Sequence, residues 1–265
     1  MIRLLIISTL LIACKGNTAE INHSQVVSYQ TKFKTNQPDS LLAGIQSKIT
    51  NAFVQGMVSK NNDKLKQLKK ELEQLYKTKN QHLILYWQSY LQFFYSIYYL
   101  EAGDKKNAEK EIDTAIDWMN NMTNKNSEDY ALLAMLEGFS LQFKGMKAMF
   151  IGPRAQKNVK AALAIDSTNL RAYYVYASND FYTPEKYGGG KEAETYLLKA
   201  ISLPAQKIKN NYLPSWGKEE AYELLIRHYI KKEKWGLAKE YFQEGIKGFP
   251  NSYTLNKLAS KLVGK

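Results

Sequence analysis

Residues 219–252 read EEAYELLIRHYIKKEKWGLAKEYFQEGIKGFPNS, and this stretch decides the fold class. Its apolar residues recur at intervals of three and four, as they do along the chain from Leu41 onward, which predicts amphipathic helices. Within it, a small residue is followed four positions later by a large apolar one and seven positions later by another small one. These residues are Ala238, Phe242 and Gly245. Small side chains at such offsets let a neighbouring helix approach closely, while the large one fills the space between.

The same small–large–small pattern occurs three more times upstream. The other copies are Ala108/Ile112/Ala115, Ala155/Val159/Ala162 and Ala193/Leu197/Ala200. Four copies predict stacked helix hairpins, each packed against its neighbours in sequence. All the prolines, Pro153 among them, are expected to lie between helices, where a missing N–H does no harm. The sequence therefore predicts an all-α solenoid.

The repeated unit resembles the tetratricopeptide repeat (TPR) family, whose unit of about 34 residues is a hairpin of two helices. Residues 219–252 match it best, although Ile226 stands where the family prefers glycine. The matching residues there are Tyr222, Leu225, Tyr229, Ala238, Phe242, Gly245 and Pro250. The resemblance covers roughly residues 86–261 and implies a TPR-like α-solenoid of antiparallel helix hairpins with about 4–5 repeats. We expect a degenerate helical hairpin at 41–80 and the array, with a C-terminal capping helix, at 81–265.

The first fourteen residues predict export. Arg3 is followed by an apolar run that is too short to span a bilayer, which is typical of a signal peptide. The run ends in LIAC at 11–14 and resembles the lipobox of bacterial lipoproteins. This resemblance implies a signal peptide at 1–13 and an acylated Cys14 that anchors the chain in a membrane; an ordinary secretory signal with an incidental cysteine is the alternative. Residues 14–40 are polar and are expected to form a flexible tether.

Charge and export together narrow the class of partner. The chain has 37 Lys+Arg against 25 Asp+Glu, a formal net charge of +12. Because an exported chain meets little nucleic acid, this charge points to acidic envelope partners or phospholipid head groups. Lys15, directly after Cys14, favours the outer membrane by analogy with enterobacterial lipoproteins. We therefore expect a lipid-anchored protein of a bacterial cell envelope.

Catalytic and metal-binding patterns are missing from the sequence. The single cysteine and three histidines are too few for a Cys/His zinc site. There is no His-Glu-x-x-His, no Gly-x-Ser-x-Gly and no thiol nucleophile motif. We therefore expect no enzyme activity, no metal and no cofactor.

The TPR resemblance also implies a binding surface, because the first helix of each TPR hairpin lines the concave face and receives peptides. The expected partner-binding residues are Tyr90, Phe93, Phe139, Phe143, Arg171, Tyr174, Phe181, Tyr182 and Arg227. Aromatic rings give contact area at low entropic cost, and arginine pairs bidentately with carboxylates, so such a face suits a peptide or a C-terminus. The alternative is that these rings pack between helices. Trp216 is expected to join the last repeat to the segment before it.

Two hairpins carry insertions between their first and second helices, on what should be the same edge of the solenoid. The first contains Pro153 and Arg154, and the second contains Tyr187, Gly188, Gly189 and Gly190, seven residues after an unusual Asp180. Three glycines before a helix can turn backbone N–H groups toward an anion or a carbonyl. The alternative is that they only form a turn with positive φ.

The function that these features predict is a non-enzymatic protein–protein interaction scaffold, anchored to the membrane, whose partner is another envelope protein or peptide. Two alternatives stay open. One is a periplasmic ligand-binding component associated with a transporter, which needs an enclosed pocket lined by the aromatic residues. The other is an outer-membrane assembly subunit.

Overall fold

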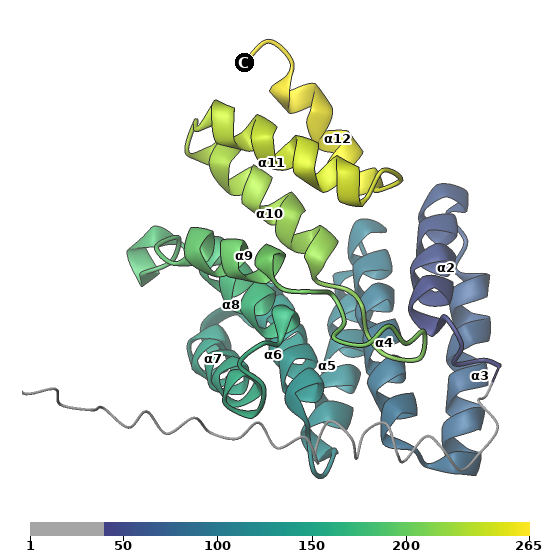
Figure 1. The fold of residues 1–265 in the computed structure, drawn as a ribbon. Helices are drawn as coiled ribbons and strands as arrows, with labels where there is room; N and C mark the ends of the chain where they lie inside the picture. Colours follow the sequence, from purple (N-terminus) through teal and green to yellow (C-terminus); the bar gives the residue numbers. More distant parts are fainter. Residues whose placement is uncertain (1–39) are drawn as a thin grey trace, which may run out of the picture. The chain divides into compact units, whose positions relative to one another are not determined.

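The computed structural model describes residues 40–265, in which helices follow one another along the chain (Figure 1). The expected signal peptide 1–13, the lipidation site Cys14 and all of the tether 14–40 except its last residue lie outside the described residues. Within 40–265, no helix is both long enough and apolar enough to cross a membrane.

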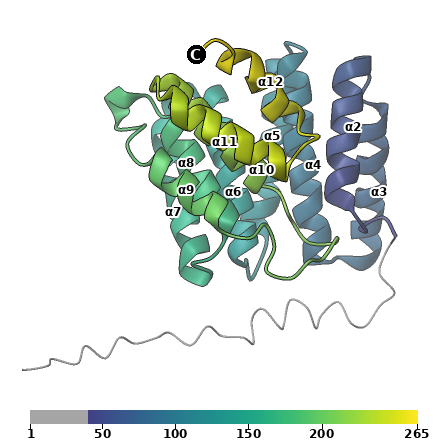
Figure 2. The ribbon, with the colours of Figure 1, turned by 45° about the horizontal axis from the view of Figure 1, so that its top comes forward.

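Residues 40–265 contain eleven α-helices and no strand, which confirms the predicted fold class. Consecutive helices pair as hairpins that stack side by side (Figures 1 and 2). The five hairpins are α2 (Ile45–Ser59) with α3 (Asp63–Lys79), α4 (His82–Glu101) with α5 (Lys105–Asn121), α6 (Ser127–Ser140) with α7 (Ala148–Ile165), α8 (Leu170–Tyr182) with α9 (Ala193–Ser202), and α10 (Lys218–Lys231) with α11 (Trp235–Gly248). Helix α12 (Tyr253–Leu262) packs on the last hairpin.

The small–large–small residues are the contact surface of the second helices. Eleven of the twelve are buried, and only Phe242 is half-buried; the buried ones are Ala108, Ile112, Ala115, Ala155, Val159, Ala162, Ala193, Leu197, Ala200, Ala238 and Gly245. Gly245 shows why a small residue is needed, because a Cβ atom there would lie 3.3 Å from Leu255 and 3.4 Å from Tyr222. The sequence pattern thus places each second helix directly against its own first helix and the next one.

Polar side chains fix where several helices begin. The carboxylate of Asp104 accepts a hydrogen bond from the N–H of Asn107 at the start of α5. At the start of α8, the side-chain oxygen of Asn169 accepts a hydrogen bond from the N–H of Ala172. At α6, Asn126 and Asp129 form a reciprocal capping box. Such caps satisfy N–H groups that have no partner inside the helix, and each contributes about 1 kcal/mol.

Pro153 does not lie between helices, as the sequence predicts, but inside α7. It is in the second turn, so the only main-chain hydrogen bond lost is the one that its N–H would have donated to Met149. That end of the helix is exposed at Met149, where water can hydrate the free carbonyl. Contrary to the expectation, Pro153 and Arg154 are therefore not in an insertion between the helices: only two 3₁₀ turns, η1 (Leu141–Phe143) and η2 (Gly145–Lys147), separate α6 from α7.

Candidate functional site

The first helices of the hairpins, α4, α6, α8 and α10, pack on one another in order and carry the predicted aromatic residues on the surface between them. A row of half-buried phenylalanines crosses α2, α4, α6 and η1. We call Phe53, Phe94, Phe93, Phe139 and Phe143 the Phe row. Successive ring centroids in this order are 5.0, 5.4, 5.0 and 5.9 Å apart. The structure therefore brings together three predicted residues, Phe93, Phe139 and Phe143, which remain partly accessible.

A second group of predicted residues meets around Arg227, on α8 and α10. The guanidinium carbon of Arg227 lies 5.9 Å from the ring centroid of Phe181 and 5.8 Å from that of Tyr182. Its Nη1 donates to the hydroxyl of Tyr182 at 3.1 Å and to the carboxylate of Glu223 at 3.2 Å. Tyr182 is exposed, whereas Arg227 and Phe181 are half-buried. We call Phe181, Tyr182, Glu223 and Arg227 the Arg227 cluster.

Two predicted binding residues are not accessible, so their assignment to the exposed face is wrong. Tyr90 is 3% exposed and Arg171 is 5% exposed. Arg171 forms an ion pair with Glu128, and its Nη1 donates to the carbonyls of Ala205 at 2.9 Å and Trp216 at 3.1 Å. Tyr174 is half-buried, with its ring centroid 6.3 Å from that of Trp216, and burial raises the pKa of its hydroxyl well above the ordinary value.

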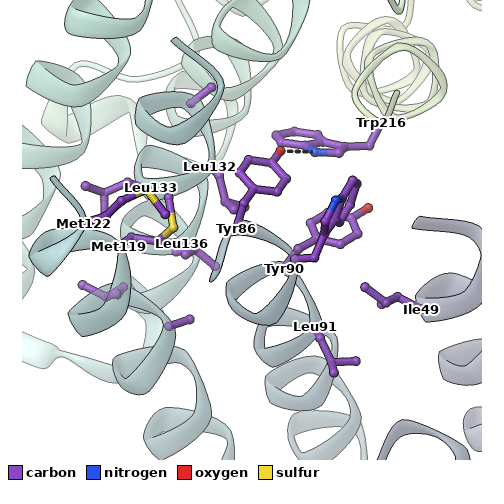
Figure 3. Packing of buried hydrophobic residues seen from close by; sticks show 14 of the residues in the cluster. Ile49, Tyr86, Tyr90, Leu91, Met119, Met122, Leu132, Leu133, Leu136 and Trp216 are labelled. Atoms are coloured by element: carbon purple, nitrogen blue, oxygen red, sulfur yellow. Dashed lines mark hydrogen bonds between the residues drawn. The ribbon is translucent and has the colours of Figure 1, made fainter. Parts of the chain in front are cut away.

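Tyr90 and Arg171 are buried because the 203–217 segment covers them. This segment connects α9 to α10 and runs back past α4 to α2 (Figures 1 and 2). Trp216 stacks on Tyr90, with centroids 6.0 Å apart, and its Nε1 donates to the hydroxyl of Tyr86 at 2.9 Å (Figure 3). Trp87 on α4 donates through Nε1 to the carbonyl of Tyr212 at 3.0 Å. Part of the expected groove is thus filled by the chain itself.

The anchoring of this segment at α2 was not foreseen from the sequence. The side-chain oxygen of Gln46 accepts hydrogen bonds from the N–H groups of Ser215 at 2.8 Å and Trp216 at 3.1 Å. The N–H of Gly44 donates to the carbonyl of Asn211 at 2.9 Å. Trp216 therefore joins the last repeats to the first two hairpins, and not only to the segment next to it.

The triple-glycine loop is a self-contained turn, which agrees with the second of the two interpretations that the sequence leaves open. The N–H groups of Gly188, Gly189 and Gly190 donate to the carbonyls of Glu185, Pro184 and Asp180 respectively. The Asp180 carboxylate accepts from the N–H groups of Glu192 at 2.9 Å and Ala193 at 2.8 Å, at the start of α9. This explains the unusual aspartate: it occupies the helix N-terminus where an anion would bind.

Tight packing accounts for one of these glycines. A Cβ atom on Gly189 would lie 2.0 Å from the carbonyl oxygen of Thr183, so no other residue fits without moving the backbone. Gly188 and Gly190 have positive φ, of 92° and 76°, which favours glycine for conformational reasons. Next to them, Tyr187 is exposed.

The first insertion is held to other helices than the second. Arg154 pairs with the buried carboxylate of Glu137 on α6, whose pKa is raised by burial. Lys144 contacts Glu109 and Asp113 on α5. The second insertion instead contacts α8, because the N–H of Gly190 donates to the carbonyl of Asp180, and Lys232 after α10, whose Nζ lies 4.0 Å from the Glu185 carboxylate.

Residues 40–265 hold no cluster of three or more His, Cys, Asp or Glu side chains that could bind a metal ion. Two shallow hollows in this part of the chain lie between α2 and α3, with Lys48 and Glu71 in both walls. Neither hollow includes a residue of the Phe row or of the Arg227 cluster. The aromatic residues of these two groups are thus partly accessible without lining either hollow.

Comparisons with known proteins bear on the fold. No protein-family model matches the chain, and no curated protein matches it. Among solved structures, a thermophilic TPR protein from Thermus thermophilus aligns with a TM-score of 0.54 at 14% identity, over 81% of this chain and 98% of that one. The HusA haemophore from Porphyromonas gingivalis aligns with a TM-score of 0.50 at 20% identity, over 73% of this chain and 96% of that one. At such identities the likeness concerns the fold alone, and that fold is a TPR-like solenoid of helix hairpins.

Proposed function

We propose that the chain is a non-enzymatic docking protein of a bacterial cell envelope, which binds an extended segment of another protein across its first helices. The observation that carries this proposal is the open aromatic surface made by the Phe row and the Arg227 cluster, which the 203–217 segment leaves uncovered. The resemblance of the N-terminus to lipoprotein signals adds a membrane anchor at Cys14.

The chemistry of this surface suits a peptide with apolar side chains and a carboxylate. Half-exposed rings offer large contact area without the entropic cost of ordering long flexible chains. Glu223 and Tyr182 accept hydrogen bonds from Nη1 of Arg227 and so fix the orientation of the guanidinium. Its other N–H groups can then donate to a second carboxylate. A C-terminal carboxylate or an acidic side chain beside aromatic residues is therefore the expected recognition element.

A photo-crosslinking experiment tests the docking surface. We expect benzoylphenylalanine at Tyr182 to capture a discrete envelope protein in cells, whereas the same group at Tyr253 should not. Tyr253 is a matched control, because it is also an exposed tyrosine but lies on α12. Adding Arg227→Ala should weaken binding of the captured partner at least about tenfold, since truncation of a hot-spot arginine costs about 2 kcal/mol or more. Equal capture from both sites, or unchanged affinity of Arg227→Ala, would exclude this surface.

Acyl labelling in cells tests the anchor. We expect metabolically supplied fatty acid to be incorporated into the wild-type chain and not into Cys14→Ser, because Cys14 is the only cysteine and the only acceptor in the lipobox-like sequence. Incorporation is a better readout than membrane fractionation, since other parts of the chain could also bind lipid. Label on Cys14→Ser, or no label on the wild type, would exclude acylation at Cys14 and support the alternative that residues 1–13 belong to an ordinary secretory signal.

The alternative of small-ligand binding finds less support. The structurally similar HusA is named as a haemophore, but the aromatic residues of this chain line neither of the two shallow hollows between α2 and α3. His228 is buried, and its Nε2 atom lies 3.5 Å from the carboxylate of Glu194. The Nε2 atom of His82 lies 2.6 Å from the carboxylate of Asp129. A protein segment therefore fits the open surface better than a compact ligand does.

A further inference from the structure

Three large apolar side chains protrude from the start of the second helix in the α6–α7 hairpin. Met146 lies in η2, and Met149 and Phe150 lie in the first turn of α7. They are 91%, 69% and 72% exposed. Single exposed apolar residues are common on proteins, but three large ones within five positions mark an interaction surface. Neither the Phe row nor the Arg227 cluster includes them.

The same part of the chain is basic. Residues 138–165 contain Lys144, Lys147, Arg154, Lys157 and Lys160 and no acidic residue. Three carboxylates of neighbouring helices face this stretch: Glu109 and Asp113 at Lys144, and Glu137 at Arg154. Five cations against three carboxylates leave a local excess of two positive charges.

The excess belongs to the exposed lysines. Lys147, Lys157 and Lys160 are exposed and form no ion pair within residues 40–265, whereas Lys144 is largely buried between its two carboxylates. Lys147 lies between Met146 and Met149 in sequence, and Lys157 lies two helical turns after Phe150. Cations thus flank the apolar side chains.

This arrangement favours a lipid surface over a protein. The three apolar side chains project outward and line neither of the two shallow hollows, so a protein partner would need a deep complementary pocket. A bilayer needs none: apolar tips enter the acyl boundary, and lysines beside them meet lipid phosphates. We propose that residues 144–157 form a reversible contact with an anionic lipid surface, separate from the anchor at Cys14 and from the docking surface.

A site-specific fluorescent probe tests this proposal in the full-length chain. Because Cys14 is the only cysteine, Cys14→Ser combined with Phe150→Cys gives a single labelling site for the environment-sensitive dye NBD. Val263→Cys in the same background is the control; Val263 is 80% exposed and follows helix α12, which packs on α10 and α11. Residues 1–13 are present in both proteins, so any binding through them affects both alike.

With vesicles of phosphatidylglycerol and phosphatidylcholine, we expect the emission maximum of the dye at 150 to shift to shorter wavelength. We also expect brominated acyl chains to quench its fluorescence. The dye at 263 should change little, and vesicles of phosphatidylcholine alone should give at least about a tenfold weaker response, because the lysines then lack anionic head groups. Lys147→Ser with Lys157→Ser, or about 1 M salt, should weaken the response similarly. No response at 150, or the same response at 150 and 263, would overturn the proposal.

Discussion

Trp216→Ala should lower the free energy of unfolding by about 3–5 kcal/mol, the range typical of a buried tryptophan truncated to alanine. Trp216 is buried although it lies outside any helix. Its ring packs on those of Tyr90 and Tyr174, and the guanidinium of Arg171 lies 5.9 Å from it. The variant therefore loses the contact that holds the 203–217 segment on α4, besides leaving a cavity.

Urea denaturation followed by far-ultraviolet circular dichroism measures this loss. Trp216→Phe is the matched variant: it keeps an aromatic ring but removes the Nε1–H that donates to Tyr86, and it should cost about 1–3 kcal/mol. Burial raises the pKa of Tyr86 well above its ordinary value, so this acceptor stays a neutral hydroxyl across the usual pH range. If Trp216→Ala cost less than about 1 kcal/mol, Trp216 would not hold the segment in place.

Loss of Trp216 also bears on the docking surface. Tyr90 is inaccessible because Trp216 covers it, whereas Phe93, about one turn further along α4, remains partly accessible. In Trp216→Ala the 203–217 segment should become more susceptible to limited proteolysis, while the helices remain folded at low urea. The groove predicted from the sequence would then be longer than in the wild type.

The contrast between Tyr90 and Phe93 shows which features of the binding surface can be predicted from the sequence and which cannot. The small–large–small pattern identifies the buried face of four of the five second helices, α5, α7, α9 and α11, because that face is set by helical periodicity and by the adjacent hairpin. Whether a ring on a first helix stays accessible depends on the path of the 203–217 segment, which contacts α4 and α2 far away in sequence. No local periodicity encodes that path; the tryptophan and the prolines Pro204 and Pro214 indicate only an ordered, non-helical connection.

The triple-glycine loop gives a second lesson of the same kind. Its composition is equally compatible with an anion site and with a tight turn, and the sequence leaves both interpretations open. The deciding group is Asp180, whose carboxylate reaches across the loop to the start of α9. Its position ten residues before the loop's last glycine could have suggested a cap, but only the fold brings it to the helix end.

Arg171→Met is expected to cost about 3–5 kcal/mol of unfolding free energy, as commonly found when one partner of a buried ion pair is removed. Arg171 is nearly inaccessible, and the change would leave Glu128 without its partner. The carbonyls of Ala205 and Trp216 would lose their donors as well, so the 203–217 segment would be weakened at both ends of its contact with α8. The loss should depend only weakly on salt, because the Arg171 side chain is buried and only Glu128 is partly exposed to solvent.

Two comparisons separate this effect from simple loss of a charge. Lys66→Ala breaks an exposed pair with Asp63, N to O 3.3 Å, and should cost no more than about 0.5 kcal/mol. The double variant Arg171→Met with Glu128→Gln should recover part of the loss, because the half-buried Glu128 side chain then no longer carries an unpaired charge. If the double variant lost as much free energy of unfolding as the two single variants together, Arg171 would stabilise the fold mainly through its hydrogen bonds to the two carbonyls. A cost of Arg171→Met close to that of Lys66→Ala would instead mean that the 203–217 segment is held by its other contacts, those of Trp216, Trp87 and Gln46.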